Sequence, residues 1–180
     1  MKAGKSNALV KTVLGALFAS LCCVATMVIQ IPTPTGGFLN LGDAVVILSA
    51  WMLGPVYGAL AAGLGSALAD IFAGYVQYAP ATFIIKALMA VCVWFVLHLF
   101  SKTADKKLKL SVLFTALGAL FAEIVMVSGY LLFEAVILQY GVGAFASVLG
   151  NCMQGLAGIV AGTLLTELLR KTKLKEKFLK

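Results

Sequence analysis

Most of the chain consists of long apolar runs, which are separated by short segments rich in proline, glycine or charged residues. An apolar run of about 20 residues is long enough to cross the hydrocarbon core of a bilayer as a helix. The pattern therefore predicts an all-α membrane protein that forms one integral membrane domain over residues 1–180. The predicted helices cover residues 8–31, 44–53, 57–73, 81–99, 110–138 and 144–169.

The stretch from residue 40 to residue 80 decides the topology, because its nearly continuous hydrophobic sequence fits either one or two crossings. As a single helix, residues 44–73 would be about 45 Å long, against a hydrocarbon core of about 30 Å. A tilted helix accommodates that length, but Gly54 and Pro55 interrupt the run and neither is favourable inside a helix. We therefore expect a break at Gly54-Pro55.

Composition agrees with a membrane protein, and the distribution of charge predicts its orientation. Hydrophobic residues make up 62% of the chain and charged residues only 12%, whereas soluble domains carry about twice that share of charge. All 14 basic residues except Lys86 lie in three clusters beside apolar runs. The clusters are Lys2, Lys5 and Lys11; Lys102, Lys106, Lys107 and Lys109; and Arg170, Lys171, Lys173, Lys175, Lys177 and Lys180.

These clusters favour two crossings for the stretch 40–80. Positively charged residues gather on the cytoplasmic side of membrane proteins, and only six crossings place all three clusters on one side. We therefore expect six transmembrane helices with both termini cytoplasmic, in a bacterial-type cell membrane. The net charge of +7 is then explained by basic residues that flank the membrane helices, so nucleic-acid binding is not expected.

With six crossings, the polar side chains inside the membrane gather in its outer half, and the cytoplasmic half is almost purely apolar. A charged side chain in hydrocarbon is costly, so it is expected to face the bundle interior and find a partner. The arrangement predicts a polar cavity that opens outward and is capped by residues 32–42 and 74–80. The polar residues concerned are Asp43, Asp70, Lys86, Glu123, Tyr130, Glu134, Asn151 and Gln154.

Most of these residues also have an ordinary structural explanation. Glu134 fits a carboxylate at the membrane interface that has no role. Lys86 fits an ion pair with Asp70 or Glu123 that holds the bundle together. Asp43 fits the N-cap of the second helix, and the amides of the sixth helix fit hydrogen bonds between helices. The tyrosines of the external loops fit an aromatic belt at the interface. A binding cavity is favoured because many of these polar residues are predicted to lie at the same depth in the membrane.

The sequence lacks the motifs of enzymes. No Lys-Ser/Thr pair follows Gly58, Gly63 or Gly65, so no Walker A nucleotide-binding loop is present. The single histidine, His98, lies at the opposite depth from the polar residues, which argues against a serine–histidine pair. The four cysteines lie in apolar runs without a CxxC motif, so no metal site is expected. We expect neither an enzyme nor a bound cofactor, and polar residues at a single depth also argue against an ion channel.

The order of several motifs resembles the substrate-binding S components of energy-coupling factor (ECF) vitamin transporters, in their riboflavin-type branch. The motifs are IPTP, NLGD, GPVYGALAAGLGSALAD, YAPATFIIKALM, EIVMVSGYLLFEA and GNCMQGLAG, which together span nearly the whole chain. The resemblance implies a six-helix subunit that captures a vitamin or a precursor from outside the cell. It also implies a separate transmembrane T component and two cytoplasmic ATPases that use ATP, and an S subunit that topples in the membrane with its ligand.

The resemblance further implies contact residues. The family contacts its T component through Ala-xxx-Ala on the first helix, for which this chain offers Gly15-xxx-Ala19 and Ala16-xxx-Ser20. Family ligand contacts come from external loops and from helices four to six. The implied substrate-binding residues are Asn40, Gln77, Tyr78, Lys86, Glu123, Tyr130, Asn151 and Gln154.

The leading hypothesis is a high-affinity substrate-capture subunit of an ATP-driven vitamin importer. Its ligand is expected to be small, polar and heteroaromatic, with vitamin B6-like or hydroxymethylpyrimidine ligands first and riboflavin or pantothenate as alternatives. Two other classes remain open. The chain would otherwise be a structural or assembly subunit that transports nothing, or a secondary carrier that works alone.

Overall fold

The computed structural model describes residues 2–33, 35, 37–101 and 108–179, with side chains from residue 8 onward. Five long helices dominate the described chain: α1 (Lys2–Val28), α2 (Gly42–Phe72), α3 (Ala79–Leu99), α5 (Leu108–Leu132) and α6 (Phe145–Lys171). Shorter elements are the π-helix η1 (Phe133–Ile137), the 3₁₀ helix η2 (Gly141–Ala144) and α7 (Leu174–Phe178). The strands β1 (Ile31–Pro32) and β2 (Phe38–Leu39) pair in an antiparallel hairpin.

Five helical segments of the described chain are long and apolar enough to cross a membrane. They are Ala8–Val28, Gly42–Phe72, Ala79–Leu99, Leu108–Ile137 and Gly141–Lys171. The predicted all-α membrane class is therefore confirmed. The number of crossings and the cytoplasmic position of the termini stay predictions.

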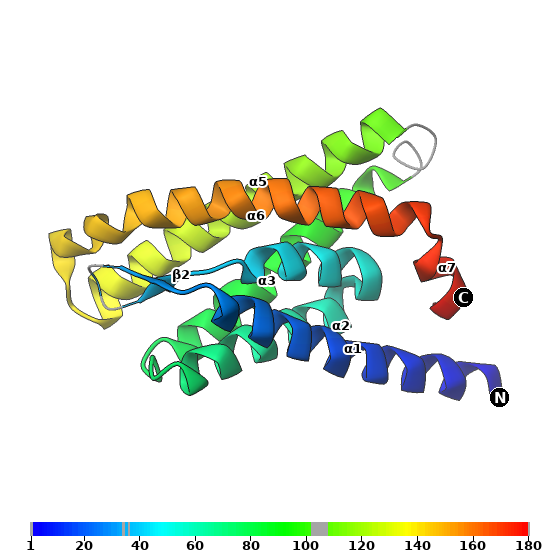
Figure 1. Cartoon of the computed structure of the whole chain (residues 1–180), viewed down its shortest axis with the longest axis horizontal. Helices are drawn as coiled ribbons and strands as arrows, with labels where there is room; N and C mark the ends of the chain where they lie inside the picture. Colours follow the sequence, from blue (N-terminus) through cyan, green and yellow to red (C-terminus); the bar gives the residue numbers. More distant parts are fainter. Residues whose placement is uncertain (1, 34, 36, 102–107, 180) are drawn as a thin grey trace.

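Helix α2 reverses direction at Gly54, and its two arms, residues 42–53 and 55–72, lie side by side (Figure 1). Gly54 has φ 80° and ψ −170°, a conformation that residues with a side chain rarely adopt. The Ser49 hydroxyl donates a hydrogen bond of 3.3 Å to the carbonyl of Gly58. Nine residues of a straight helix would separate the two residues by about 13 Å. The break expected at Gly54-Pro55 is thus a hairpin turn between two helical arms.

The bundle has two distinct ends (Figure 1). The loop end contains the β1–β2 hairpin, the connection 73–78 between α2 and α3, and η2. The terminal end contains the start of α1, the Gly54 turn and α7. Buried apolar side chains, among them Met89, Val93 and Met126, fill the interior between these ends.

Several element boundaries differ from the predicted ones. Helix α1 ends at Val28 rather than at residue 31, because the chain enters the β1–β2 hairpin there. The last turn of the fifth predicted helix, residues 133–137, is a π-helix. The basic tail forms the additional helix α7, whose Leu174 packs against the core. From the predicted middle basic cluster, Lys102, Lys106 and Lys107 lie outside the described residues.

Candidate functional site

A buried ion pair joins α2 and α3 below the loop end. The Lys86 ammonium group donates a hydrogen bond to Asp43, and their side chains are 1% and 0% exposed. The second Asp43 oxygen accepts a bond of 2.5 Å from Nε2 of Gln154 on α6. Oε1 of Gln154 accepts a bond of 2.9 Å from the backbone N–H of Asn40. Because buried charges require such partners, the network fixes three helices and the segment before α2 relative to one another.

A second polar cluster surrounds Glu134 in η1. Its carboxylate accepts hydrogen bonds from the hydroxyl groups of Thr35 at 2.9 Å, Tyr78 at 3.1 Å and Ser147 at 2.5 Å. Burial raises the pKa of the Tyr78 phenol, and the neighbouring Glu134 carboxylate acts in the same direction, so Tyr78 stays a donor. Glu134 therefore connects the β1–β2 loop, the α2–α3 connection and α6 at one point.

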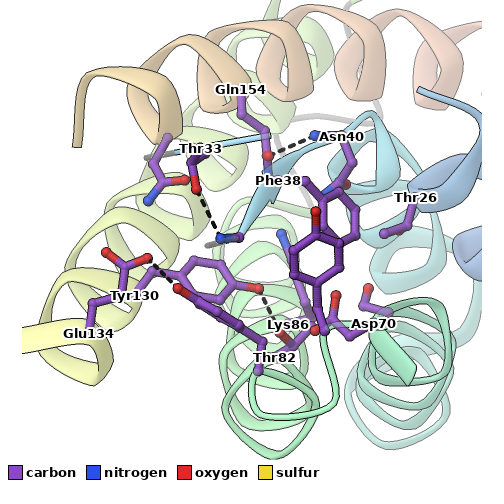
Figure 2. Close-up of a pocket in the computed structure, with 15 residues that line it drawn as sticks. Thr26, Thr33, Phe38, Asn40, Asp70, Thr82, Lys86, Tyr130, Glu134 and Gln154 are labelled. Atoms are coloured by element: carbon purple, nitrogen blue, oxygen red, sulfur yellow. Dashed lines mark hydrogen bonds between the residues drawn. The ribbon is translucent and has the colours of Figure 1, made fainter. Parts of the chain in front are cut away.

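Between these two clusters lies a narrow cavity of about 30 Å³ (Figure 2). A larger ligand therefore requires residues at the loop end to move. The lining residues are Thr26, Thr33, Gly37, Phe38, Asn40, Ser66, Asp70, Tyr75, Tyr78, Thr82, Lys86, Tyr130, Glu134, Asn151 and Gln154.

Aromatic rings form much of the cavity wall. The ring centroids of Phe38 and Tyr75 are 4.7 Å apart, and the Lys86 ammonium lies 5.7 Å from the centre of the Tyr130 ring. The Tyr130 hydroxyl forms a hydrogen bond of 3.0 Å with that of Thr82 (Figure 2). The cavity thus combines flat apolar faces with amide, hydroxyl, carboxylate and ammonium groups, which are suited to planar polar ligands.

The structure brings six of the eight predicted substrate-binding residues together around the cavity. Gln77 is exposed on the α2–α3 connection and does not line it. Glu123 also lies outside the lining; within the described chain neither of its buried carboxylate oxygens has a hydrogen-bond partner. The direct contact of any of them with a ligand stays a prediction. The six residues that line the cavity are Asn40, Tyr78, Lys86, Tyr130, Asn151 and Gln154.

Two expectations about the charged residues were wrong. Lys86 pairs with Asp43, and not with Asp70 or Glu123, because the side chain of Asp43 points into the bundle from the first turn of α2. Asp43 is also not the N-cap of that helix. Instead, the side-chain oxygen of Asn40 accepts a bond of 2.8 Å from the N–H of Gly42.

The predicted caps, residues 32–42 and 74–80, do contribute to the lining of the cavity, but sequence reasoning missed most of its hydroxyl residues and did not name Phe38. Thr82 lies one helical turn before Lys86, so i, i+4 spacing on one helix face was a signal that would have found it. Thr26 and Ser66 carry no such signal. A Ser or Thr in an apolar helix can bond to a backbone carbonyl of its own helix, so its presence does not indicate a cavity. Thr33 and Phe38 reach the cavity only through the geometry of the β1–β2 hairpin.

The two small-residue frames on α1 have different surroundings. A Cβ atom added to Gly65 of α2 would lie 2.3 Å from the carbonyl oxygen of Ala19, so α1 and α2 approach closely there. The Gly15-xxx-Ala19 frame is therefore partly buried against α2. Ala16 and Ser20 are exposed, and the Ser20 hydroxyl bonds to the Ala16 carbonyl at 3.0 Å.

The half of the bundle toward the terminal end is less apolar than expected. Glu167 of α6 is 6% exposed, and its carboxylate accepts bonds of 2.7 Å from Ser111 and 2.9 Å from Thr115 of α5. Arg170 lies 3.6 Å away on the next turn. The sequence was misleading because Glu167 stands near a basic tail, where a solvated carboxylate is ordinary. The prediction of an almost purely apolar cytoplasmic half was wrong.

Comparison with known proteins gives two matches. A family model described as "ECF-type riboflavin transporter, S component" matches residues 6–171 of the 180. A curated protein from Pyrococcus woesei, described as an uncharacterized protein in gap 3'region, is 37% identical over 150 residues. These residues are 82% of this chain and 93% of the relative.

Proposed function

Because the chain belongs to the family of ECF-type riboflavin transporter S components, we propose that it captures a heteroaromatic vitamin in the cavity at the loop end. Members of this family are substrate-binding subunits of membrane vitamin transporters. The observation that carries the proposal is the cavity at the loop end, which presents aromatic faces and hydrogen-bonding groups to one small volume. An ordinary packing defect in a membrane bundle would be lined by apolar side chains.

The polar groups of the cavity suit the edge of a heteroaromatic ring. Oδ2 of Asp70 is buried and has no hydrogen-bond partner among the described residues. Leaving such an acceptor unpaired costs about 1–3 kcal/mol, so an N–H or O–H group of the ligand contributes affinity there. The amides of Asn151 and Gln154, which also line the cavity, offer both donors and acceptors.

Riboflavin and single-ring vitamins are the two ligand candidates. The description of the matching family names riboflavin. The narrow cavity favours a smaller ligand. Riboflavin has a tricyclic ring with a sugar-alcohol chain, so it would displace more of the loop-end residues than a pyridine or pyrimidine ring. Riboflavin is therefore to be compared with pyridoxine and hydroxymethylpyrimidine on the same preparation.

Delivery across the membrane is proposed to depend on partner subunits. The cavity ends at the Lys86–Asp43 pair, beyond which the core contains Met89, Val93 and other apolar side chains. Such a core offers a polar ligand no continuous route to the terminal end. A T component and two ATPases would supply the movement, and the exposed Ala16-xxx-Ser20 frame is the surface of α1 open to a partner helix.

We further propose that the chain lies in a bacterial-type cell membrane, crosses it six times and has both termini in the cytoplasm.

The decisive experiment is to purify the chain in mild detergent, identify any co-purified small molecule by mass spectrometry, and titrate the emptied protein. Saturable binding of riboflavin, pyridoxine or hydroxymethylpyrimidine is expected, with one of them clearly preferred. A preference for pantothenate, which has no aromatic ring, would contradict a heteroaromatic ligand. Absence of binding to all heteroaromatic vitamins would favour an assembly subunit instead. Vitamin uptake by vesicles that contain only this chain would favour an autonomous carrier.

A further inference from the structure

Two buried oxygen atoms on one side of the loop-end cavity have no hydrogen-bond partner among the described residues. They are Oδ2 of Asp70, near the end of α2, and Oγ1 of Thr26, near the end of α1. The two residues are 5% and 2% exposed, and both line the cavity (Figure 2). Because buried polar groups in proteins are nearly always paired, two unpaired ones beside one cavity indicate a place where a ligand completes the site.

Thr26 and Asp70 face each other across the contact between α1 and the 55–72 arm of α2. Both helical segments run from the terminal end to the loop end, so they are parallel (Figure 1). One turn earlier on each segment, Sγ of Cys22 lies 3.3 Å from Oγ of Ser66. Residues four apart lie on the same helix face, so one further turn on each helix leads from this contact to Thr26 and Asp70. The two unpaired oxygens do not bond to each other, and they are placed to share one ligand group.

The hydroxyl of Thr26 differs from other hydroxyls of the long helices. Those of Thr12, Ser20 and Ser128 each donate a hydrogen bond to the carbonyl four residues earlier, which satisfies them within their own helix. Thr26 makes no such bond, although the carbonyl of Cys22 stands at the same spacing. The Thr26 hydroxyl is therefore left for a partner at the cavity.

Asp70 also lacks a cation of its own. Lys86 is the only lysine or arginine among the described residues that line the cavity, and its ammonium group is paired with Asp43. Thr82 and Lys86 both interact with Asp70 from α3, but neither gives Oδ2 a hydrogen bond. Within the described chain no ion pair involves Asp70. A buried carboxylate is stabilised by an opposite charge or by strong donors, so a ligand with N–H groups supplies what Asp70 lacks.

We propose that Asp70 and Thr26 form a subsite for an amino or ammonium substituent of the vitamin, so that the chain selects heteroaromatic ligands that carry one. An amino group has at least two N–H donors, one for the Asp70 carboxylate and one for the Thr26 hydroxyl oxygen. A ligand hydroxyl has a single donor hydrogen and brings no positive charge to the carboxylate. The inference rests on the proposed vitamin-binding function and narrows its class of ligand.

Two matched pairs of ligands test the subsite on the full chain, emptied of ligand in mild detergent. Pyridoxamine has an aminomethyl group where pyridoxine has a hydroxymethyl group. In the second pair, 4-amino-5-hydroxymethyl-2-methylpyrimidine is compared with its 4-hydroxy analogue. Isothermal titration measures the four affinities and that of riboflavin. We expect the amino member of at least one pair to bind about tenfold more tightly than its hydroxyl counterpart, as a hydrogen bond to a charged group predicts.

Variants assign this preference to the two residues. Asp70→Asn keeps the size of the side chain but removes its charge, so the preference for the amino member should fall to about twofold or less. Thr26→Val removes only the hydroxyl and should lower the preference about fivefold. Thr12→Val, which changes an exposed hydroxyl bonded to its own helix, should leave the preference unchanged. A monodisperse peak in size-exclusion chromatography and an unchanged circular dichroism spectrum confirm the folding of each variant.

The outcomes separate this inference from the proposed function. Equal or weaker binding of the amino member in both pairs would overturn the subsite while vitamin binding stands. So would tighter binding of riboflavin than of either amino ligand, or a preference that both Asp70→Asn and Thr26→Val leave intact. If Asp70→Asn fails to fold, Thr26→Val alone decides. Absence of binding to every heteroaromatic vitamin would instead overturn the proposed function, and the subsite with it.

Discussion

The ammonium group of Lys86 on α3 is paired with the carboxylate of Asp43 on α2, and both side chains are almost completely closed off from solvent. Lys86 also lines the loop-end cavity, and Asp43 is held by Gln154, which lines the same cavity. One charge pair thus stabilises the bundle and forms the floor of the candidate site. The loss of either partner would leave a charge that has neither water nor a counter-ion.

We therefore expect Asp43→Asn to lower the free energy of unfolding by about 3–5 kcal/mol. Lys86→Met should have a similar effect, whereas the double variant should be more stable than either single variant, because no uncompensated charge remains. Denaturant unfolding in detergent, followed by circular dichroism, measures this cycle. Strictly additive losses in the double variant would show that the two groups do not depend on one another.

The Glu134 cluster is expected to control how long a ligand stays bound. Glu134→Gln replaces a carboxylate that accepts three hydroxyl bonds by a weaker, neutral acceptor. Loosening of the β1–β2 loop should raise the rate of vitamin dissociation by about tenfold, which corresponds to about 1.4 kcal/mol. Stopped-flow dissociation measures the rate, with Ser128→Ala, an exposed hydroxyl on α5, as the control. Equal rates in wild type and Glu134→Gln would mean that the loop is not held by this residue.

Asn151 and Glu123 offer a test of the extent of the binding site. Asn151 lines the cavity, so Asn151→Ala should weaken vitamin affinity about tenfold through a lost hydrogen bond to the ligand. Glu123 lies outside the lining, so Glu123→Gln should leave affinity within about twofold. Isothermal titration measures both variants. A marked loss of affinity in Glu123→Gln would make Glu123 a ligand contact, as the resemblance to the family implied.

The two small-residue frames on α1 predict opposite outcomes for bulky substitutions. Ala16→Trp adds a ring on the exposed face and should prevent assembly with the T component while vitamin binding is retained. Ala19→Trp should destabilise the subunit itself, because α1 approaches Gly65 of α2 closely at that position. Co-purification with the T component and the unfolding temperature separate the two effects. Normal assembly of Ala16→Trp would exclude this frame as the contact.

Much of the fold was predictable because membrane helices follow simple rules of length and polarity. The apolar runs predicted the long helices, and Gly54-Pro55 predicted the reversal within α2, since both residues act through the local backbone. The π-helix around Glu134 and the helix α7 had no such local signal. Both depend on contacts with distant segments, such as those of Glu134 with Thr35 and of Leu174 with the core.

The sequence by itself determined that the chain is an α-helical membrane protein, because its apolar runs are long enough to span a bilayer and hydrocarbon excludes most charged groups. Only the tertiary structure decided which polar residues meet. Helix rotation brings Asp43 rather than Asp70 or Glu123 to Lys86, turns Ala19 inward and Ala16 outward, and buries Glu167 against α5. These pairings arise from close packing between segments far apart in the chain, which spacing along one helix does not specify.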